Sequence, residues 1–179
     1  MKLHLTRAQL LHEWRLRSFP EPVNDGCSVV QTGGVDLDEY ISARMDDWYH
    51  ALLAEAPVDM LAPVEMAGSV EAVLVDGGLA SVMLTDHVVR VAELRIEGLG
   101  QVALASGGPA RSVVGPRRFS PRRSPGRAVA VVDGHELLIY PPVPFTSAPR
   151  IESLMAVTDI AGEYRLDRRA LGTITIDKL

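Results

Sequence analysis

The sequence predicts an α+β fold in which helices come first and a run of antiparallel strands follows. Three observations lead to this prediction. Apolar residues recur at helical spacing over residues 37–52, they alternate with period two from residue 70 onward, and Asp-Gly turns separate pairs of alternating segments. At 179 residues the chain has the length of a single domain. We expect a helical part over 1–57, an antiparallel β meander or sandwich over 69–145, and a C-terminal segment over 146–179.

A short first helix is expected over about residues 6–17. Thr6 and Gln9 have the spacing of a capping box, in which each side chain bonds the other residue's backbone N–H. The segment Phe19-Pro20-Glu21-Pro22 ends the helix, and a turn-rich stretch follows it.

The second helix has the clearest pattern in the chain. Asp36 and Glu39 form another capping box, and Pro57 ends the helix. Five apolar residues between them fall within an arc of about 80° on a helical wheel. They are Leu37, Ile41, Met45, Trp48 and Leu52. We therefore expect this stripe to face the core, with Glu39, Asp46 and His50 on the opposite side, facing solvent or an interface.

Alternating apolar residues predict the strands of the β part. VEAVLV and LASVML flank the turn Asp76-Gly77-Gly78 and predict a hairpin. A strand over 88–96, a turn over 98–100 and a return over 101–105 extend it into a meander. The segments 127–132 and 135–140 predict a second hairpin across Asp133-Gly134. Further along, 150–157 is a candidate strand, and 164–174 is compatible with a helix or a strand.

An arginine-rich, proline-rich segment interrupts the strands, and we call residues 107–127 the arm. Its candidate contact residues are six arginines and one aromatic: Arg111, Arg117, Arg118, Phe119, Arg122, Arg123 and Arg127. No Asp or Glu lies between Gly98 and Val132, whereas the rest of the chain has 12 of the 18 Lys and Arg residues and all 23 acids. A cationic segment is thus attached to an acidic body, which predicts a partner near the arm.

The arm has three physical interpretations. Its arginines could reach the phosphates of a nucleic acid, with Phe119 stacking on a base. They could instead pair with carboxylates on a neighbouring copy of the same protein. The third possibility is a flexible surface loop. A single aromatic is a poor stacking platform and no recognition motif accompanies it, so the sequence favours a loop or an intersubunit arm over direct nucleic-acid binding.

The residues that could carry chemistry do not form a recognisable catalytic pattern. Asp46 and His50 have the i and i+4 spacing of a metal pair, but no third ligand is near and a solvated polar face is favoured. Asp86-His87 is interpreted as a turn, and Cys27 as a loop thiol without a base beside it. The chain lacks both the GxGxxG and the P-loop signatures. We expect no enzyme, no metal and no cofactor.

Composition indicates a protein of a reducing compartment that does not enter a membrane. The one cysteine cannot form an internal disulfide. The start of the chain is too short an apolar run for a signal peptide, and no 18 consecutive apolar residues follow.

Five stretches of the sequence resemble a known family. They are Glu55-Ala56-Pro57, Met60-Leu61, Val82-Met83-Leu84-Thr85-Asp86, Val88-Val89-Arg90-Val91 and HELLIYPPVP over 135–144. Their order resembles that of the head-to-tail connector (adaptor) proteins of tailed bacteriophages, over roughly residues 36–145. Thr85 stands where that family has proline, and Leu99 where it often has an aromatic residue.

The resemblance implies a structural virion protein without an active site. Such a connector is assembled in the bacterial host cytoplasm as a homo-oligomeric ring, twelvefold in this family, and joins the portal protein to the tail proteins. DNA passes through the ring, which allows non-specific DNA contact. On this interpretation the arginines serve assembly first and DNA contact second. The alternative is a small nucleic-acid-binding module that uses residues 111–127.

Overall fold

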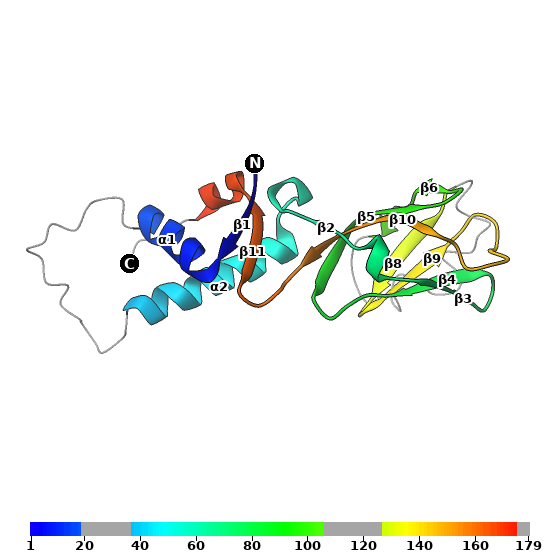
Figure 1. Cartoon of the computed structure of the whole chain (residues 1–179), viewed down its shortest axis with the longest axis horizontal. Coiled ribbons are helices and arrows are strands. Elements are labelled where there is room, and N and C mark those ends of the chain that lie inside the picture. Colours follow the sequence, from blue (N-terminus) through cyan, green and yellow to red (C-terminus); the bar gives the residue numbers. More distant parts are fainter. Residues whose placement is uncertain (19–36, 106–126, 175–179) are drawn as a thin grey trace, which may run out of the picture. The chain divides into compact units, whose positions relative to one another are not determined.

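The computed structural model describes residues 1–18, 37–105 and 127–174 and shows the predicted α+β class (Figure 1). The contacts group the chain, which the sequence predicts to be one domain, into two compact units. The helical unit comprises Met1–Ala62 and Asp159–Leu179, and the β unit comprises Pro63–Thr158. The C-terminal segment predicted over 146–179 is therefore divided between the units.

The helical unit combines two helices with a short antiparallel strand pair. Strand β1 (Lys2–Thr6) leads into helix α1 (Arg7–Ser18), and α2 (Leu37–Glu55) is followed by the 3₁₀ helix η1 (Val58–Met60). The C-terminal part forms strand β11 (Glu163–Asp167) and the 3₁₀ helix η4 (Arg168–Thr173). β1 pairs with β11, with Leu3 opposite Leu166. Strand β1 has no local signal in the sequence, because its partner lies about 160 residues away in the chain.

Helix α1 begins with the predicted capping box. The Thr6 N–H donates to Gln9 Oε1 at 2.9 Å, and the Gln9 N–H donates to Thr6 Oγ1 at 3.4 Å. Leu10 and Trp14 are buried, so the first helix is held by one apolar face.

Helix α2 ends before Pro57 as predicted, but its buried face is rotated from the predicted stripe. Ile41, Met45 and Leu52 are buried, and so are Tyr49 and Leu53, which the stripe omitted. Trp48 is only partly buried. Its ring packs edge to face against that of Trp14, with the ring centroids 6.1 Å apart. Its indole N–H donates to Thr173 Oγ1 at 3.2 Å. The amphipathic tryptophan therefore lies at the margin of the core, where its N–H finds a partner.

The β unit contains two sheets. One has the order β2-β10-β5-β6, and the other has the order β3-β4-β9-β8-β7. The elements are β2 (Val64–Glu65), the 3₁₀ helix η2 (Ala67–Ser69), β3 (Ala72–Val75), β4 (Leu79–Met83), β5 (Val88–Ile96), β6 (Gly100–Gln101), β7 (Ala103–Ala105), β8 (Val129–Asp133), β9 (Glu136–Tyr140) and β10 (Ile151–Thr158).

Both predicted hairpins are present, but the predicted meander is wrong in two respects. β3 pairs with β4 and β8 with β9, both antiparallel. However, β5 joins the other sheet, where it pairs with β10. The return strand is divided as well: β6 pairs with β5, whereas β7 runs parallel to β8. Tight turns encode hairpins locally, but a strand with partners far along the chain depends on tertiary packing.

Both sheets contribute side chains to one buried core. Its members are Ala80, Val82, Leu84, Leu94, Ile96, Val102, Ala128, Ala130, Leu137, Ile139 and Leu154. Each fully buried leucine or isoleucine contributes about 1.5–3 kcal/mol. This core supports the sheet edges on which the candidate site lies. Among the described residues, the helices are too short or too polar to cross a membrane.

Candidate assembly surface

The arm joins the β unit at one edge of the five-stranded sheet. Strand β7, at that edge, ends at Ala105, and β8 begins beside it at Val129. The two strands run parallel, with Ala103 opposite Val129 and Ala105 opposite Val131. The arm therefore leaves at one end of this strand pair and returns at the other, about 7–10 Å away. Its two attachment points are set by the sheet.

Most of the predicted contact residues lie outside the described residues. They are Arg111, Arg117, Arg118, Phe119, Arg122 and Arg123. Arg127 is described and exposed. It lines a hollow of about 410 Å³ together with Glu93 and Gln101, at the base of the arm. Glu93 also accepts a hydrogen bond from the Arg95 Nε at 2.7 Å, so its charge is already partly offset.

The opposite edge of the same sheet is strand β3, which pairs on one side only. Val73 and Leu74 are 59% and 40% exposed on this edge. Glu71 and Asp76 immediately precede and follow the strand, and both are exposed. Within the described ranges, neither carboxylate takes part in an ion pair or a hydrogen bond. An apolar edge strand is thus flanked by two unneutralised negative charges.

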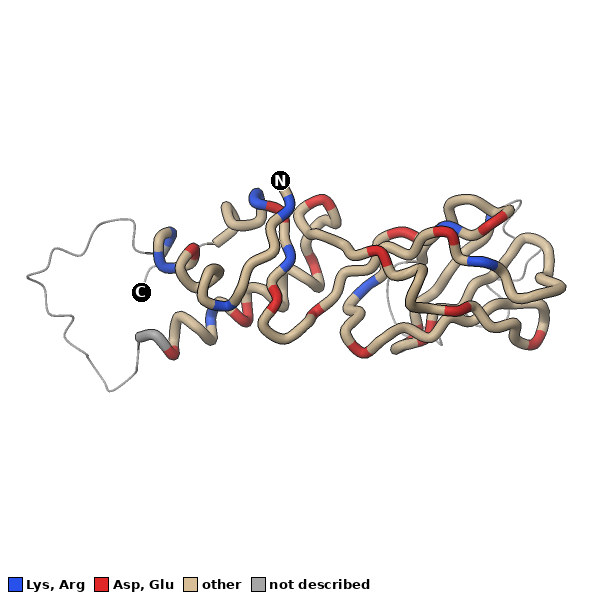
Figure 2. The backbone as a smooth tube through the Cα atoms, in the orientation of Figure 1, with Lys and Arg blue, Asp and Glu red and all other residues tan. Residues whose placement is uncertain are grey.

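Carboxylates predominate over the whole β unit (Figure 2). Its described residues include nine acids and four arginines. The acids are Glu65, Glu71, Asp76, Asp86, Glu93, Glu97, Asp133, Glu136 and Glu152, and the arginines are Arg90, Arg95, Arg127 and Arg150. The β unit is therefore opposite in sign to the arm. Opposite charges attract, so the excess of carboxylates favours the approach of a cationic segment.

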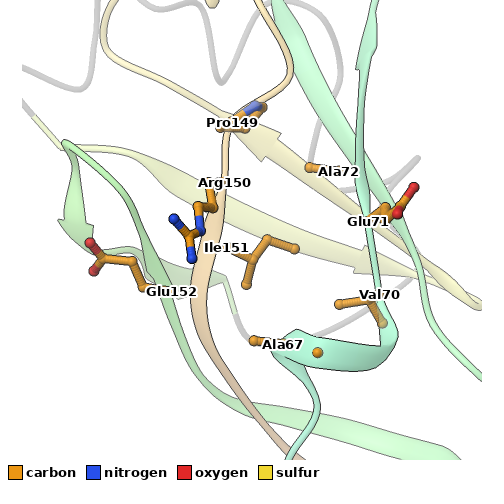
Figure 3. Close-up of a pocket in the computed structure, with 9 residues that line it drawn as sticks. Ala67, Val70, Glu71, Ala72, Pro149, Arg150, Ile151 and Glu152 are labelled. Carbon is orange, nitrogen blue, oxygen red and sulfur yellow. The ribbon is translucent and has the colours of Figure 1, made fainter.

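A hollow of about 490 Å³ lies between the start of β3 and the start of β10 (Figure 3). Ala67, Val70 and Ile151 give it apolar walls. The carboxylates of Glu71 and Glu152 point outward on opposite sides of it. Arg150 also lines this hollow, so it presents charges of both signs and lacks the arrangement of an anion site.

Glu65 holds the segment that forms one wall of this hollow. Its carboxylate accepts hydrogen bonds from the N–H groups of Ala67 at 2.9 Å and Leu154 at 2.8 Å, and from the Ser153 hydroxyl. The Ser153 hydrogen bond, followed by the bond from Leu154, lowers the pKa of Glu65 below its ordinary value. One side chain thus fixes η2 against β10.

In the structure Asp46, His50 and Asp86, which the sequence suggested as chemical candidates, each contact a different residue from the one considered. Asp46 binds Arg7 at 2.7 and 2.9 Å, whereas the His50 Nε2 lies 3.4 Å from Asp159. Asp86 lies 3.9 Å from the His135 ring. Cys27 is outside the described residues. Within the described ranges, no three acidic, histidine or cysteine side chains are grouped as metal ligands.

Two polar networks in the helical unit had no local signal in the sequence. The Arg7 guanidinium joins Asp46, the Tyr164 hydroxyl at 2.9 Å and Ser42 Oγ at 2.5 Å. Asp167 is buried, and it accepts from the backbone N–H and the Nε of Arg169, both at 3.0 Å. Asp167 also accepts from the amino group of Met1 at 2.9 Å, so both networks connect segments far apart in the chain and stabilise the unit.

Comparisons of the chain with family models, with curated proteins and with solved structures found no match. In the strand order, the arm joins one sheet edge, and β3, an acid-flanked strand paired on one side only, is the other edge.

Proposed function

We propose that this chain is a structural protein that assembles with copies of itself through the arm, and that it serves as a head-to-tail connector of a tailed bacteriophage. The observation that carries the proposal is the separation of charge. The arm has six arginines and no acid, whereas the described part of the β unit has nine acids and four arginines. A cationic segment on one copy therefore has an acidic counterpart on the next.

The positions of these two charged features favour a ring. The arm joins the sheet at the β7–β8 edge, and the acid-flanked strand β3 is the other edge of that sheet. A contact between two different surfaces of identical chains is heterologous, and such contacts close into rings when the rotation between subunits permits. A twelvefold ring, the portal and tail proteins as partners, location in the virion, and DNA passing through the centre are the parts of this proposal that come from the family resemblance.

The proposal is tested by deleting Arg111 to Pro125 from the full chain. We expect the intact protein to form closed rings in electron micrographs and a high-mass species in light scattering, and to sediment with portal protein. The deletion should abolish all three. A matched control replaces the prolines at 116, 121 and 125 by alanine, which keeps every arginine. An intact protein that stays monomeric and ignores portal protein would refute the proposal.

A nucleic-acid-binding module is the second candidate, favoured by the density of arginines around Phe119. It predicts that labelled duplex binds to the isolated monomer. The log of affinity should then fall steeply with the log of salt concentration, with a slope close to the number of phosphates neutralised. A shallow slope, or no binding at moderate salt, rejects this candidate and leaves the assembly proposal unaffected.

A further inference from the structure

We infer that strand β3 of one copy binds residues 111–117 of a second copy's arm as an added strand. This inference rests on the proposed function, because it names the surface that the arm recognises during assembly. The site consists of the outer edge of Ala72–Val75 with the carboxylates of Glu71 and Asp76 at its two ends.

Strand β3 has the properties of an edge that accepts another strand. It pairs only with β4, so in the described part of the chain the outward backbone groups of this edge have no strand partner. Val73 is 59% exposed, and no charged residue, proline or bulge protects the four residues of the strand. Exposed apolar edges of this kind form ladder hydrogen bonds with extended segments, which supply affinity through the main chain.

The arm contains one stretch that matches this edge in length and charge. Ser112-Val113-Val114-Gly115 supplies four residues with backbone N–H groups, including two β-branched side chains suited to a strand. Arg111 precedes it, and Arg117 follows Pro116, which ends the ladder because it has no N–H. In extended chain the two arginines are about 20 Å apart, and the Glu71 and Asp76 positions are about 17 Å apart. One arginine can therefore reach the carboxylate at one end of the strand, and the other arginine can reach the carboxylate at the other end.

The strand order assigns the arm to a second copy. β7 and β3 are the two edges of one five-stranded sheet, separated by four strand spacings, or about 19 Å. To bind its own β3 edge the arm would have to cross a face of its own sheet, whereas the β3 edge of a second copy can lie next to β7. Repetition of this contact is head-to-tail, in agreement with a ring.

Cysteine pairing between two differently tagged full-length chains tests the contact. Cys27 is the only cysteine and is first replaced by serine in every chain. One chain then carries Val73→Cys and the other carries Val113→Cys or Val114→Cys, since directly opposed strand residues are close enough for a disulfide. We expect a disulfide-linked dimer that contains one of each tag. The matched control is Val89→Cys, because Val89 is 43% exposed and lies in β5 of the other sheet.

Each outcome of this experiment has a defined meaning. Equal cross-linking at Val73→Cys and Val89→Cys overturns the inference. A dimer of two Val73→Cys chains as the main product would indicate pairing of two β3 edges and would also overturn it. A chain with both cysteines that links internally, while the mixed chains do not, would show that the arm covers its own sheet and would exclude a second copy.

Charge reversal separates a failure of this inference from a failure of the proposed function. Glu71→Arg with Asp76→Arg should weaken association roughly tenfold or more, and Arg111→Glu with Arg117→Glu on the second chain should restore it. Glu97→Arg with Glu152→Arg changes net charge equally and should have a smaller effect. If the intact chain forms rings but both charge-reversed pairs associate equally, the site is wrong and the assembly proposal stands. If the intact chain never associates, both are refuted.

Discussion

The backbone N–H of Phe145 donates a hydrogen bond to the carbonyl oxygen of Gly78 at 2.8 Å. This contact brings the segment after β9 against the β3–β4 turn so closely that a Cβ atom on Gly78 would lie 2.4 Å from the Pro144 Cβ. Gly78 also has a φ of 74°, in the left-handed region that disfavours other residues. Two independent constraints therefore require glycine at this turn.

Gly78→Ala should lower the free energy of unfolding of the protein by more than about 1 kcal/mol, because it adds a steric clash to the backbone strain. Gly77→Ala is the matched control, since Gly77 has a φ of 81° but nothing within 4 Å of its Cβ position. Urea unfolding followed by circular dichroism measures both. Equal effects of the two substitutions would show that the contact with Pro144 contributes nothing.

Stability should decrease in acid partly because of Glu65. Its hydrogen bonds to Ser153 and Leu154 lower its pKa in the folded state. A carboxyl with a depressed folded pKa stabilises the fold above the unfolded pKa, and this contribution is lost as the pH falls through the folded pKa. Glu65→Gln should reduce the melting temperature at neutral pH, and the difference from wild type should shrink below about pH 4. Glu71→Gln, which removes an exposed carboxylate without hydrogen bonds in the described part of the chain, is the control and should change the melting temperature at neutral pH less.

Asp167 should be important for the β1–β11 pair. It is only 3% exposed. The hydrogen bond from the backbone N–H of Arg169, followed by those from the Met1 amino group and the Arg169 side chain, holds the pKa of Asp167 well below its ordinary range. Asp167→Asn replaces an acceptor of several hydrogen bonds by a neutral amide, so amide hydrogen exchange at Leu3 and Leu5 should accelerate. Asp159→Asn, at a position whose side chain is 38% exposed, is the control. Unchanged exchange in Asp167→Asn would contradict this role.

The bidentate contact between Arg7 and Asp46 should be more stabilising than an ordinary surface pair. A double-mutant cycle with Arg7→Ala and Asp46→Ala should give a coupling free energy of about 1 kcal/mol, because two N–H groups of the guanidinium bind the two carboxylate oxygens. The helical pair of Glu13 and Arg17 serves for comparison and should give about 0.3–0.5 kcal/mol. Similar couplings for the two pairs would show that the bidentate geometry adds nothing.

Some elements of this fold can be predicted from neighbouring residues alone. The Thr6 and Gln9 capping box, the end of α2 before Pro57 and the hairpin turns at Gly77 and Gly134 all depend on contacts within a few residues. Their free energies are local, so short sequence patterns carry the signal. The rotation of α2 could not be predicted, because Tyr49 is buried by its ring contact with Tyr164 at 4.8 Å.

The candidate surface, like the fold, could be predicted from the sequence only in part. The sequence by itself determined that the arm is cationic and the rest of the chain acidic, because charge depends only on residue type. Only the tertiary structure decided that the arm starts at one edge of a sheet, that Glu71 and Asp76 flank the other edge, and that β5 pairs with β10. Such placements follow from long-range strand pairing and shared core burial, and their stabilising contacts join residues that are distant in the chain.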